Sequence, residues 1–299
     1  MTQAIINKEK LIKERNETIL KAIEIELLEN QKPNRFCFEL PRINELEEIT
    51  RFDTGMYGER FKSIEFLIKN YKDGYFKIDN SKIKSGNTPD VRFIGNIKAL
   101  KYHWATPTNC SDYGVLKEER INLEGKNNIN KDCILLINRT SKGGKGEYVG
   151  IAGFYDFKEL GAGHHNQGMY QIAEYKKIDL IFMLCLLNCE LMRKYCSGMS
   201  AGSKMKELKM EQFLQIPFPN FPESIQIEIS KLYHNTEIDY KANTFTVDNF
   251  LDKDNEYNQQ AGIYELDKTA KQLKKILNQA IEKIVDDKEV SLDFYEREK

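Results

Sequence analysis

The chain has 299 residues, enough for one large domain or two smaller ones with a substantial core. Its formal net charge of −1 argues against a protein that binds polyanions over its whole surface. The longest apolar run, residues 180–187, is too short to cross a membrane, and the first residues form no apolar signal core. Six cysteines without a CxxC pair favour reduced thiols, so we expect a cytoplasmic protein with no membrane partner.

Two long helices are predicted, one toward each end of the chain. In residues 8–30, apolar residues recur at helical spacing, and Pro33 ends the pattern. In residues 264–285 the spacing is tighter and forms a heptad seam, typical of a coiled coil. We expect this seam to pack on its own domain, on the N-terminal helix or on a partner subunit. Its members are Leu266, Ala270, Leu273, Leu277, Ala280 and Ile284.

The middle of the chain has a different texture. Residues 72–155 alternate short β-branched and aromatic runs with turn residues, which predicts a β-rich region. Residues 178–198 predict one buried helix, whereas residues 241–262 are polar and poorly periodic, which indicates a linker. The predicted fold class is α+β, a mixed or antiparallel β-rich domain with a few packed helices, plus long N- and C-terminal helices.

Sequence motifs for catalysis are missing. The chain has no [DNS]PP[FYW], GxSxG or HExxH motif, and its SKGGKG stretch lacks the Ser or Thr that follows the lysine of a phosphate loop. The stretch GAGHHNQGMY, residues 161–170, could form a metal-dependent nuclease centre from His164, His165 and Asn166. Adjacent residues on an extended chain point to opposite faces, so both histidines could not bind one ion. We therefore expect no cofactor, no metal and no catalytic residue.

Several short motifs follow one another within residues 72–235 in an informative order. An SGNTP turn (85–89) precedes a strand and turn (131–146), the pair Asn166-Gln167 and a closing segment. The closing segment carries Gly202, Ser203, Leu208, Phe213, Ile216, Pro217, Pro219, Gln226 and Ile229. In this order the motifs resemble those of the target-recognition domain of the specificity (S) subunit of type I restriction–modification systems. Residues 51–70 resemble a lead-in that precedes some of these domains.

The chain also departs from that family. Only one recognition domain fits, Gln226 stands two residues late, and residues 241–262 interrupt the spacer helix. The resemblance therefore points to a half-length subunit. It divides the chain into a long N-terminal helix (1–35), a helical lead-in (36–71), a DNA-specificity domain (72–235), a linker (236–262) and a coiled-coil-like helix (263–299).

The resemblance implies a non-catalytic, DNA-binding protein of host defence. Its partners would be double-stranded DNA, an adenine methyltransferase (modification) subunit and, in a complete system, a restriction subunit. Two copies could pair through the long helices and read a two-part site. An alternative is a non-catalytic interaction or antirestriction protein that reuses the fold.

Candidate DNA contacts come from the loops of the recognition domain. Basic groups suit phosphates, and planar polar side chains suit base edges. Residues 72–234 have a modest excess of Lys and Arg over Asp and Glu, which permits such binding. We expect the sole tryptophan, Trp104, in the core. The expected contacts are Lys84, Ser85, Asn87, Thr88, Tyr102, His103, Thr106, Asn109, Arg139, Thr140, Ser141, Lys142, Lys145, His165, Ser203 and Lys204.

Overall fold

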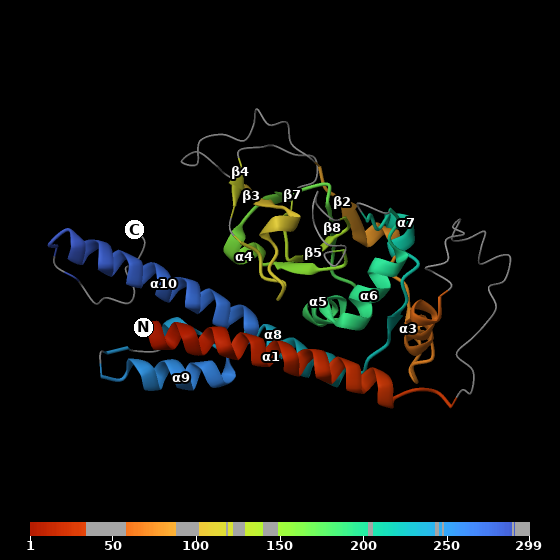
Figure 1. The fold of residues 1–299 in the computed structure, drawn as a ribbon, viewed down its shortest axis with the longest axis horizontal. Coiled ribbons are helices and arrows are strands. Elements are labelled where there is room, and N and C mark those ends of the chain that lie inside the picture. The colour runs from red at the N-terminus through yellow and green to blue at the C-terminus, as the bar shows by residue number, and fades with distance from the viewer. Residues whose placement is uncertain are drawn as a thin grey trace. The chain divides into compact units, whose positions relative to one another are not determined.

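The computed structural model describes residues 1–33, 58–87, 102–117, 119–121, 129–139, 149–202, 206–242, 245–246, 248–288 and 290. The chain divides into two compact units, the first made of residues 1–19 and 228–299 and the second of residues 20–227. Figure 1 labels most of the elements, which are numbered in chain order. Of the helices in the described ranges, none is both long and apolar enough to span a bilayer.

All the strands of the described residues belong to the second unit. A four-stranded antiparallel sheet has the order β2-β8-β5-β6, and a three-stranded sheet has the order β4-β3-β7. Within the smaller sheet, β3 pairs antiparallel with β4 and parallel with β7. A further pair joins β1 to β9. The strands are β1 Tyr75–Phe76, β2 Ile83–Ser85, β3 Tyr102–Ala105, β4 Arg120–Ile121, β5 Cys133–Ile137, β6 Ala152–Tyr155, β7 Gly163–His165, β8 Met169–Ile172 and β9 Phe218–Pro219.

Helices accompany these strands in the second unit. The four longest are α3 Glu59–Lys69, α5 Leu180–Asn188, α6 Glu190–Met199 and α8 Glu223–Tyr233, of which α8 continues into the first unit. Shorter turns of helix are α4 Phe157–Leu160 and α7 Met210–Phe213. The expected lead-in, residues 36–71, contains α3, and its part up to residue 57 lies outside the described residues.

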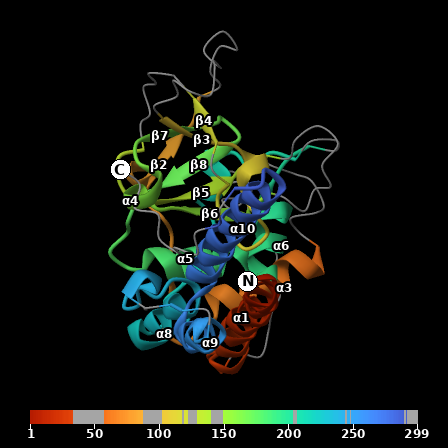
Figure 2. The ribbon, with the colours of Figure 1, turned by 90° about the vertical axis from the view of Figure 1, so that its left-hand side faces the viewer.

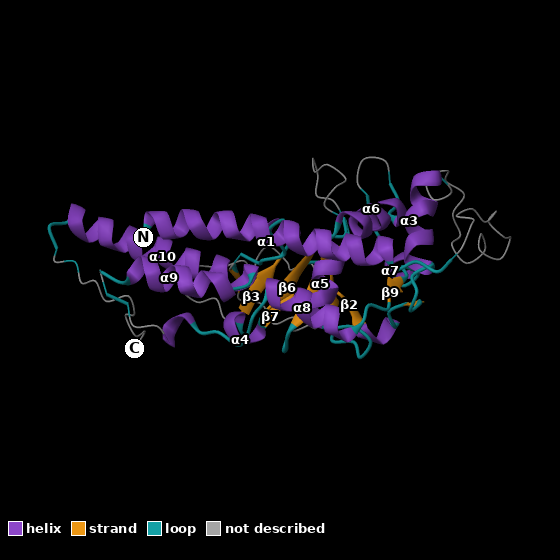
Figure 3. Ribbon diagram, turned by 90° about the horizontal axis from the view of Figure 1, so that it is seen from below, coloured by secondary structure: helices purple, strands orange, loops and turns teal. Residues whose placement is uncertain are grey.

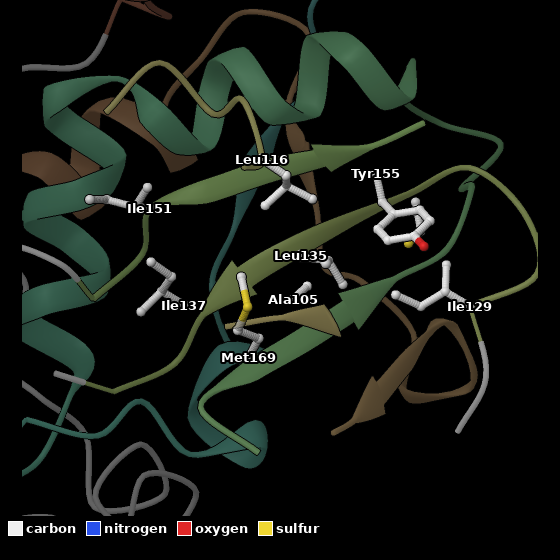
Figure 4. Close-up of a cluster of buried hydrophobic side chains, with 9 residues drawn as sticks. Ala105, Leu116, Ile129, Leu135, Ile137, Ile151, Tyr155 and Met169 are labelled. Carbon is white, nitrogen blue, oxygen red and sulfur yellow. The ribbon is translucent and has the colours of Figure 1, made fainter. Parts of the chain in front are cut away.

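The core of the second unit surrounds β5, the central strand of the larger sheet. All five residues of β5 are buried, so both faces of the strand are covered. One face carries Leu135 and Ile137, which pack with Ala105 of β3 and Met169 of β8 (Figure 4). Helix α5 contacts β5 and β6, and its apolar residues are buried from Phe182 to Leu187. The expected fold class, an antiparallel β-rich domain with packed helices, is confirmed (Figure 2).

One predicted helix is divided. Residues 178–198 were expected to form a single buried helix, but α5 ends and α6 begins at Cys189, whose ψ of 150° is extended. The Asn188 side chain accepts a hydrogen bond from the Ala152 N–H and donates one to the Ala152 carbonyl, both at 2.9 Å. Asn188 thus anchors the break to strand β6. Cys185 and Cys189 are buried, as expected for core residues.

The first unit is helical. It contains residues 2–19 of α1 (Thr2–Glu29), together with α9 Phe250–Gln260 and α10 Ile263–Val285, which appear in Figure 3. Ala4 and Ile5 of α1 form an apolar cluster with Phe250 of α9 and Leu273 of α10. Both long helices expected from the sequence are therefore present, and they pack together.

The segment expected to be an irregular linker, residues 241–262, contains a helix. Helix α9 buries Phe250, Asp254, Tyr257 and Asn258, which share one helical face. Two of these four residues are polar, so the buried face has no apolar periodicity for the sequence to reveal. The linker interpretation is wrong for residues 250–260 because a polar network, not an apolar stripe, holds this helix.

That polar network is centred on a buried ion pair. The Lys8 Nζ lies 2.7 Å from the Asp254 Oδ1, and both side chains are almost completely inaccessible. Asp254 also accepts hydrogen bonds from the Tyr240 hydroxyl at 2.8 Å and from the Asn258 side-chain amide at 2.9 Å. Lys8 donates to Asn258 as well and lies over the rings of Tyr240 and Tyr257. Burial lowers the pKa of Lys8, although its bond to Asp254 opposes that shift.

The predicted seam of α10 is used in part within the chain. Three of its residues are buried in the first unit, namely Leu266, Ala270 and Leu273. These three therefore pack within their own chain and cannot contact a partner subunit. Leu277 and Ala280 are partly exposed, and Ile284 is 62% exposed. Leu277 also packs against the apolar cluster of the first unit, so Ile284 is the seam residue that the described residues leave most exposed.

Candidate nucleic-acid interface

The motifs that stand far apart in the sequence meet at one end of the larger sheet. Strand β2 pairs with β8, which places Ser85 opposite Tyr170 and Lys84 opposite Gln171. Just beyond this pair, the Asn87 N–H donates to the His165 carbonyl at 3.1 Å. The SGN turn therefore lies directly against the turn that contains Asn166-Gln167.

Gly86 makes this close approach feasible. A Cβ built at Gly86 would lie 2.3 Å from the carbonyl oxygens of both His165 and Asn166. Real Cβ atoms do not come so close to backbone oxygens, so any side chain would separate the two turns. The glycine of the SGN motif has a packing reason, independent of any ligand.

The Asn166 turn is fixed by its own side chain and by β3. The Asn166 Oδ1 accepts a hydrogen bond from the Gly168 N–H at 2.7 Å, an Asx turn that the residue type favours. The Asn166 N–H donates to the Ala105 carbonyl at 2.8 Å, and the Asn166 carbonyl accepts from the Met169 N–H at 3.0 Å. These bonds join the end of β3 to the turn between β7 and β8.

The end of β5 completes the arrangement. The Asn138 N–H donates to the Gly168 carbonyl at 3.0 Å, and the Asn138 side chain donates to the Gln167 carbonyl at 3.2 Å. The Asn138 carbonyl accepts from the Leu208 N–H at 2.6 Å, which brings in the closing segment. These bonds join the SGN turn, the Asn166 turn, the end of β5 and the closing segment in one hydrogen-bonded edge. We call this edge, together with the neighbouring turn 106–109, the recognition rim and define it as residues 84–87, 106–109, 138–139 and 166–168.

A small pocket lies within the recognition rim. Its volume is about 330 Å³, and it is lined by Thr106, Pro107, Thr108, Glu119, Arg139, Asn166 and Gly168. A Cβ placed on Gly168 would be 3.1 Å from the Asn166 Oδ1 and 3.5 Å from the Arg139 Nε. Gly168 therefore forms the part of the pocket wall that lies beside both the Asn166 side chain and the Arg139 guanidinium.

A buried asparagine holds the acidic side of the pocket. Asn109 donates through its side-chain nitrogen to the Glu119 Oε2 at 2.7 Å and to the Trp104 carbonyl at 3.1 Å. Its oxygen accepts from the hydroxyls of Thr106 and Thr108. All the polar atoms of the amide are thereby occupied, and the orientation of Glu119 is set from within the protein.

The structure places the expected contact residues in three groups. Lys84, Ser85 and Asn87 are exposed on the rim, and Tyr102, Thr106 and Arg139 are partly buried. His103, Asn109 and His165 are buried. The expected contacts that lie outside the described residues are Thr88, Thr140, Ser141, Lys142, Lys145, Ser203 and Lys204.

Burial removes three residues from the expected contacts. His103 is fully buried, with its ring edge against Tyr155 at a centroid distance of 5.2 Å. Asn109 is 5% exposed and bonded as described above, and His165 is 1% exposed. None of the three can reach a duplex from these positions. Trp104 is 7% exposed, as expected for a core residue.

The adjacent histidines are part of the core. His164 is 4% exposed, and its ring packs edge-on against Tyr102 at 5.1 Å. Burial lowers the pKa of His165 to about 4, so this imidazole is neutral at physiological pH. Within the described ranges, no three His, Cys, Asp or Glu side chains are grouped so that they could hold a metal ion. The geometry therefore does not favour a nuclease centre at this pair.

The pocket is lined by residues that the sequence does not single out as contacts. Glu119 and Thr108 are not among the expected contacts, and Asn166 is named there only as a family landmark and as a member of the alternative nuclease centre. In the sequence, nothing distinguishes Glu119 from Glu118 beside it. Only the hydrogen bond from Asn109 identifies Glu119, whereas the Asn-x-Gly spacing at Asn166 is a turn signal that could have been followed further.

Comparisons with known proteins give structural similarity alone. No protein-family model and no curated protein matches the chain. Among solved structures, a chain from work on complex assembly and conformational transition of the type I R-M system is 14% identical, with a TM-score of 0.40, over 81% of this chain and 55% of that one. The HsdS subunit from Thermoanaerobacter tengcongensis is 10% identical, with a TM-score of 0.40, over 90% of this chain and 52% of that one. The chain therefore spans about half the length of these structures.

Proposed function

We propose that the chain is the DNA sequence-recognition subunit of a type I or type I-like restriction–modification system. In this role it has no catalytic activity and directs a partner adenine methyltransferase, with a restriction subunit where the system has one, to a target site. The observation that carries the proposal is the recognition rim. Motifs between residues 85 and 208, which resemble those of target-recognition domains, are joined there by backbone hydrogen bonds.

The rim has the properties that reading a duplex requires. Sequence readers need a rigid backbone that positions polar groups, with cations for phosphate and planar side chains for bases. The hydrogen bonds of Asn138 and Asn166 fix the rim, and Lys84, Ser85 and Asn87 project from it into solvent. An exposed lysine beside exposed hydroxyl and amide groups suits phosphate positioning followed by base contacts.

A two-part target would need a second recognition domain. We propose that a second copy supplies it and that the copies meet through the far half of α10. Ile281 is 49%, Ile284 is 62% and Val285 is 78% exposed, an apolar group left uncovered by the residues that the structure describes. Sedimentation of the chain with its methyltransferase and target DNA tests this assembly. A complex that contains one copy of this chain would contradict it.

Comparing adenine methylation across the genome, in cells with and without the gene for this chain, tests the proposed function. We expect methylation to disappear at one defined sequence when the gene is deleted and to return when it is restored. A variant with Lys84, Ser85 and Asn87 changed to alanine should fail to restore it, because the variant lacks the exposed groups proposed to contact the duplex. Unchanged methylation, together with no sequence preference in DNA binding, would favour an interaction or antirestriction protein.

A further inference from the structure

The pocket of the recognition rim contains one cation and one anion that face the same space. Arg139 and Glu119 both line its volume of about 330 Å³. A carboxylate is repelled by DNA phosphates, so a pocket that only bound the backbone would gain nothing from Glu119. A carboxylate at a DNA-facing surface is favourable where it accepts a hydrogen bond from an exocyclic amine of a base.

Arg139 supplies an available donor group. Its side chain is partly buried at the end of β5, and its guanidinium makes no hydrogen bond or ion pair with any residue that the structure describes. Its backbone is held by a bridge to Glu207, which fixes where the side chain begins. A guanidinium fork donates two parallel hydrogen bonds, and the O6 and N7 of guanine accept them in the major groove.

Glu119 supplies a positioned acceptor. Its Oε2 is occupied by the Asn109 side chain at 2.7 Å, whereas its Oε1 accepts nothing from the described part of the chain. Asn109 is itself buried and fully bonded, so the carboxylate does not have to be ordered when DNA binds. The free oxygen matches the N4 amine of cytosine, the partner base of guanine.

The hydrogen bond made by Asn166 argues against adenine as the base that this pocket contacts. Asparagine reads adenine by accepting from N6 while donating to N7. Here the Asn166 Oδ1 already accepts from the Gly168 N–H at 2.7 Å, which ties the amide to its own turn and disfavours the reorientation that a two-bond contact with adenine would require. The pocket therefore offers the Arg139 guanidinium as a donor and the Glu119 carboxylate as an acceptor, which is the pattern that a guanine–cytosine pair complements.

We propose that this pocket reads one guanine–cytosine pair of the target, with Arg139 donating to guanine and Glu119 accepting from cytosine. Asn109 is a positioning residue that acts through Glu119. This inference rests on the proposed function and specifies one base pair that it would read.

Selection from a library of random DNA duplexes tests the inference, with the full chain in complex with its methyltransferase. Wild-type protein should enrich a motif that contains an obligatory G·C pair. Arg139→Ala and Glu119→Ala should each relax the preference at that same pair, by about tenfold to a hundredfold, and leave the other positions of the motif unchanged. Arg139→Lys keeps the charge but not the fork, so it should bind duplexes in general while losing the same preference.

Lys84→Ala is the matched control, because Lys84 is an exposed cation on the same rim but does not line the pocket. It should weaken binding to all duplexes alike and keep the motif. If Arg139→Ala behaves like Lys84→Ala, Arg139 contacts a phosphate and the inference is wrong. If the two alanine variants alter different positions, or none, it is also wrong. A wild-type complex that enriches no motif would instead overturn the proposed function. Circular dichroism of each variant establishes that the fold is retained.

Discussion

The buried pair formed by Lys8 and Asp254 makes a stringent prediction about the first unit. Changing Lys8 to Met keeps the length of the side chain and removes its charge, which leaves the Asp254 carboxylate buried with Tyr240 and Asn258 as its donors among the residues that the structure describes. Removing one partner of a buried ion pair typically costs about 3–5 kcal/mol, since the remaining charge has lost its compensation. We expect a loss of that size in Lys8→Met.

The double variant Lys8→Met, Asp254→Leu separates this effect from simple loss of packing. It removes both charges and fills the site with apolar groups, a change that is often close to neutral. Tyr240 and Asn258 then lose an acceptor, each at about 1–3 kcal/mol if it finds no other. We therefore expect the double variant to be more stable than Lys8→Met alone, with a coupling free energy of at least about 2 kcal/mol.

Urea unfolding provides the measurement. Circular dichroism follows the helices, and the emission of Trp104, the only tryptophan, reports separately on the second unit. Asp254→Leu alone completes the cycle and leaves Lys8 without its carboxylate. A cost below about 1 kcal/mol for Lys8→Met, or a double variant no more stable than Lys8→Met, would refute the view that the charge pair holds α9 in place.

Three further predictions concern the second unit. Because the folded pKa of His165 is about 4 and its ordinary value is 6.5, the unfolded chain gains a proton first, and stability should fall by up to about 3 kcal/mol as the pH drops from 6.5 toward 4. His165→Gln should flatten that part of the stability profile in urea titrations, and equal slopes in both proteins would contradict the assignment. Gly86→Ala should destabilise the unit by about 1–3 kcal/mol and abolish motif selection, since its Cβ would meet two backbone oxygens at 2.3 Å; an unchanged melting temperature with selection intact would disprove this. Asp179→Ala should cost about 1 kcal/mol in urea unfolding, because the carboxylate caps α5 by accepting from the Phe182 N–H at 2.8 Å, whereas Asp179→Asn should retain most of that stability; equal losses would show that the cap is unimportant.

The sequence predicts elements well where apolar residues mark the buried face. The helix expected at residues 264–285 corresponds to α10, because its seam is apolar at regular spacing. The neighbouring α9 could not be found in this way, since Asp254 and Asn258 occupy half of its buried positions and Lys8, far away in sequence, compensates them. A helix whose burial depends on a distant cation has no local signature.

The candidate site, like the fold, could be predicted from the sequence only in part. The order of the motifs identified three of the four segments of the recognition rim, because turn glycines and asparagines have local reasons to be where they are. The fourth segment, residues 106–109, belongs to none of those motifs. Whether an individual polar side chain is buried or exposed could not be predicted from the sequence. Strand alternation suggested that one of the two adjacent histidines would face outward, yet both are buried, because burial depends on what covers a strand and not on the strand alone. Glu119 likewise acquires its orientation only through Asn109.

The first unit is built from two segments that lie far apart in the chain, so its parts are synthesised at different times. Lys8 and Asn258, which bond to each other, are 250 residues apart in the chain. At a translation rate of about 5–20 residues per second, the first turns of α1 would wait roughly 12–50 s for the helices that cover them. During that interval Lys8 remains hydrated, while residues 20–227 are already available to fold. Residues at the start of α1 are thus synthesised long before the helices that bury them, and a ribosome that stalls before residue 250 would leave the apolar face of α1, with Ala4 and Ile5, uncovered.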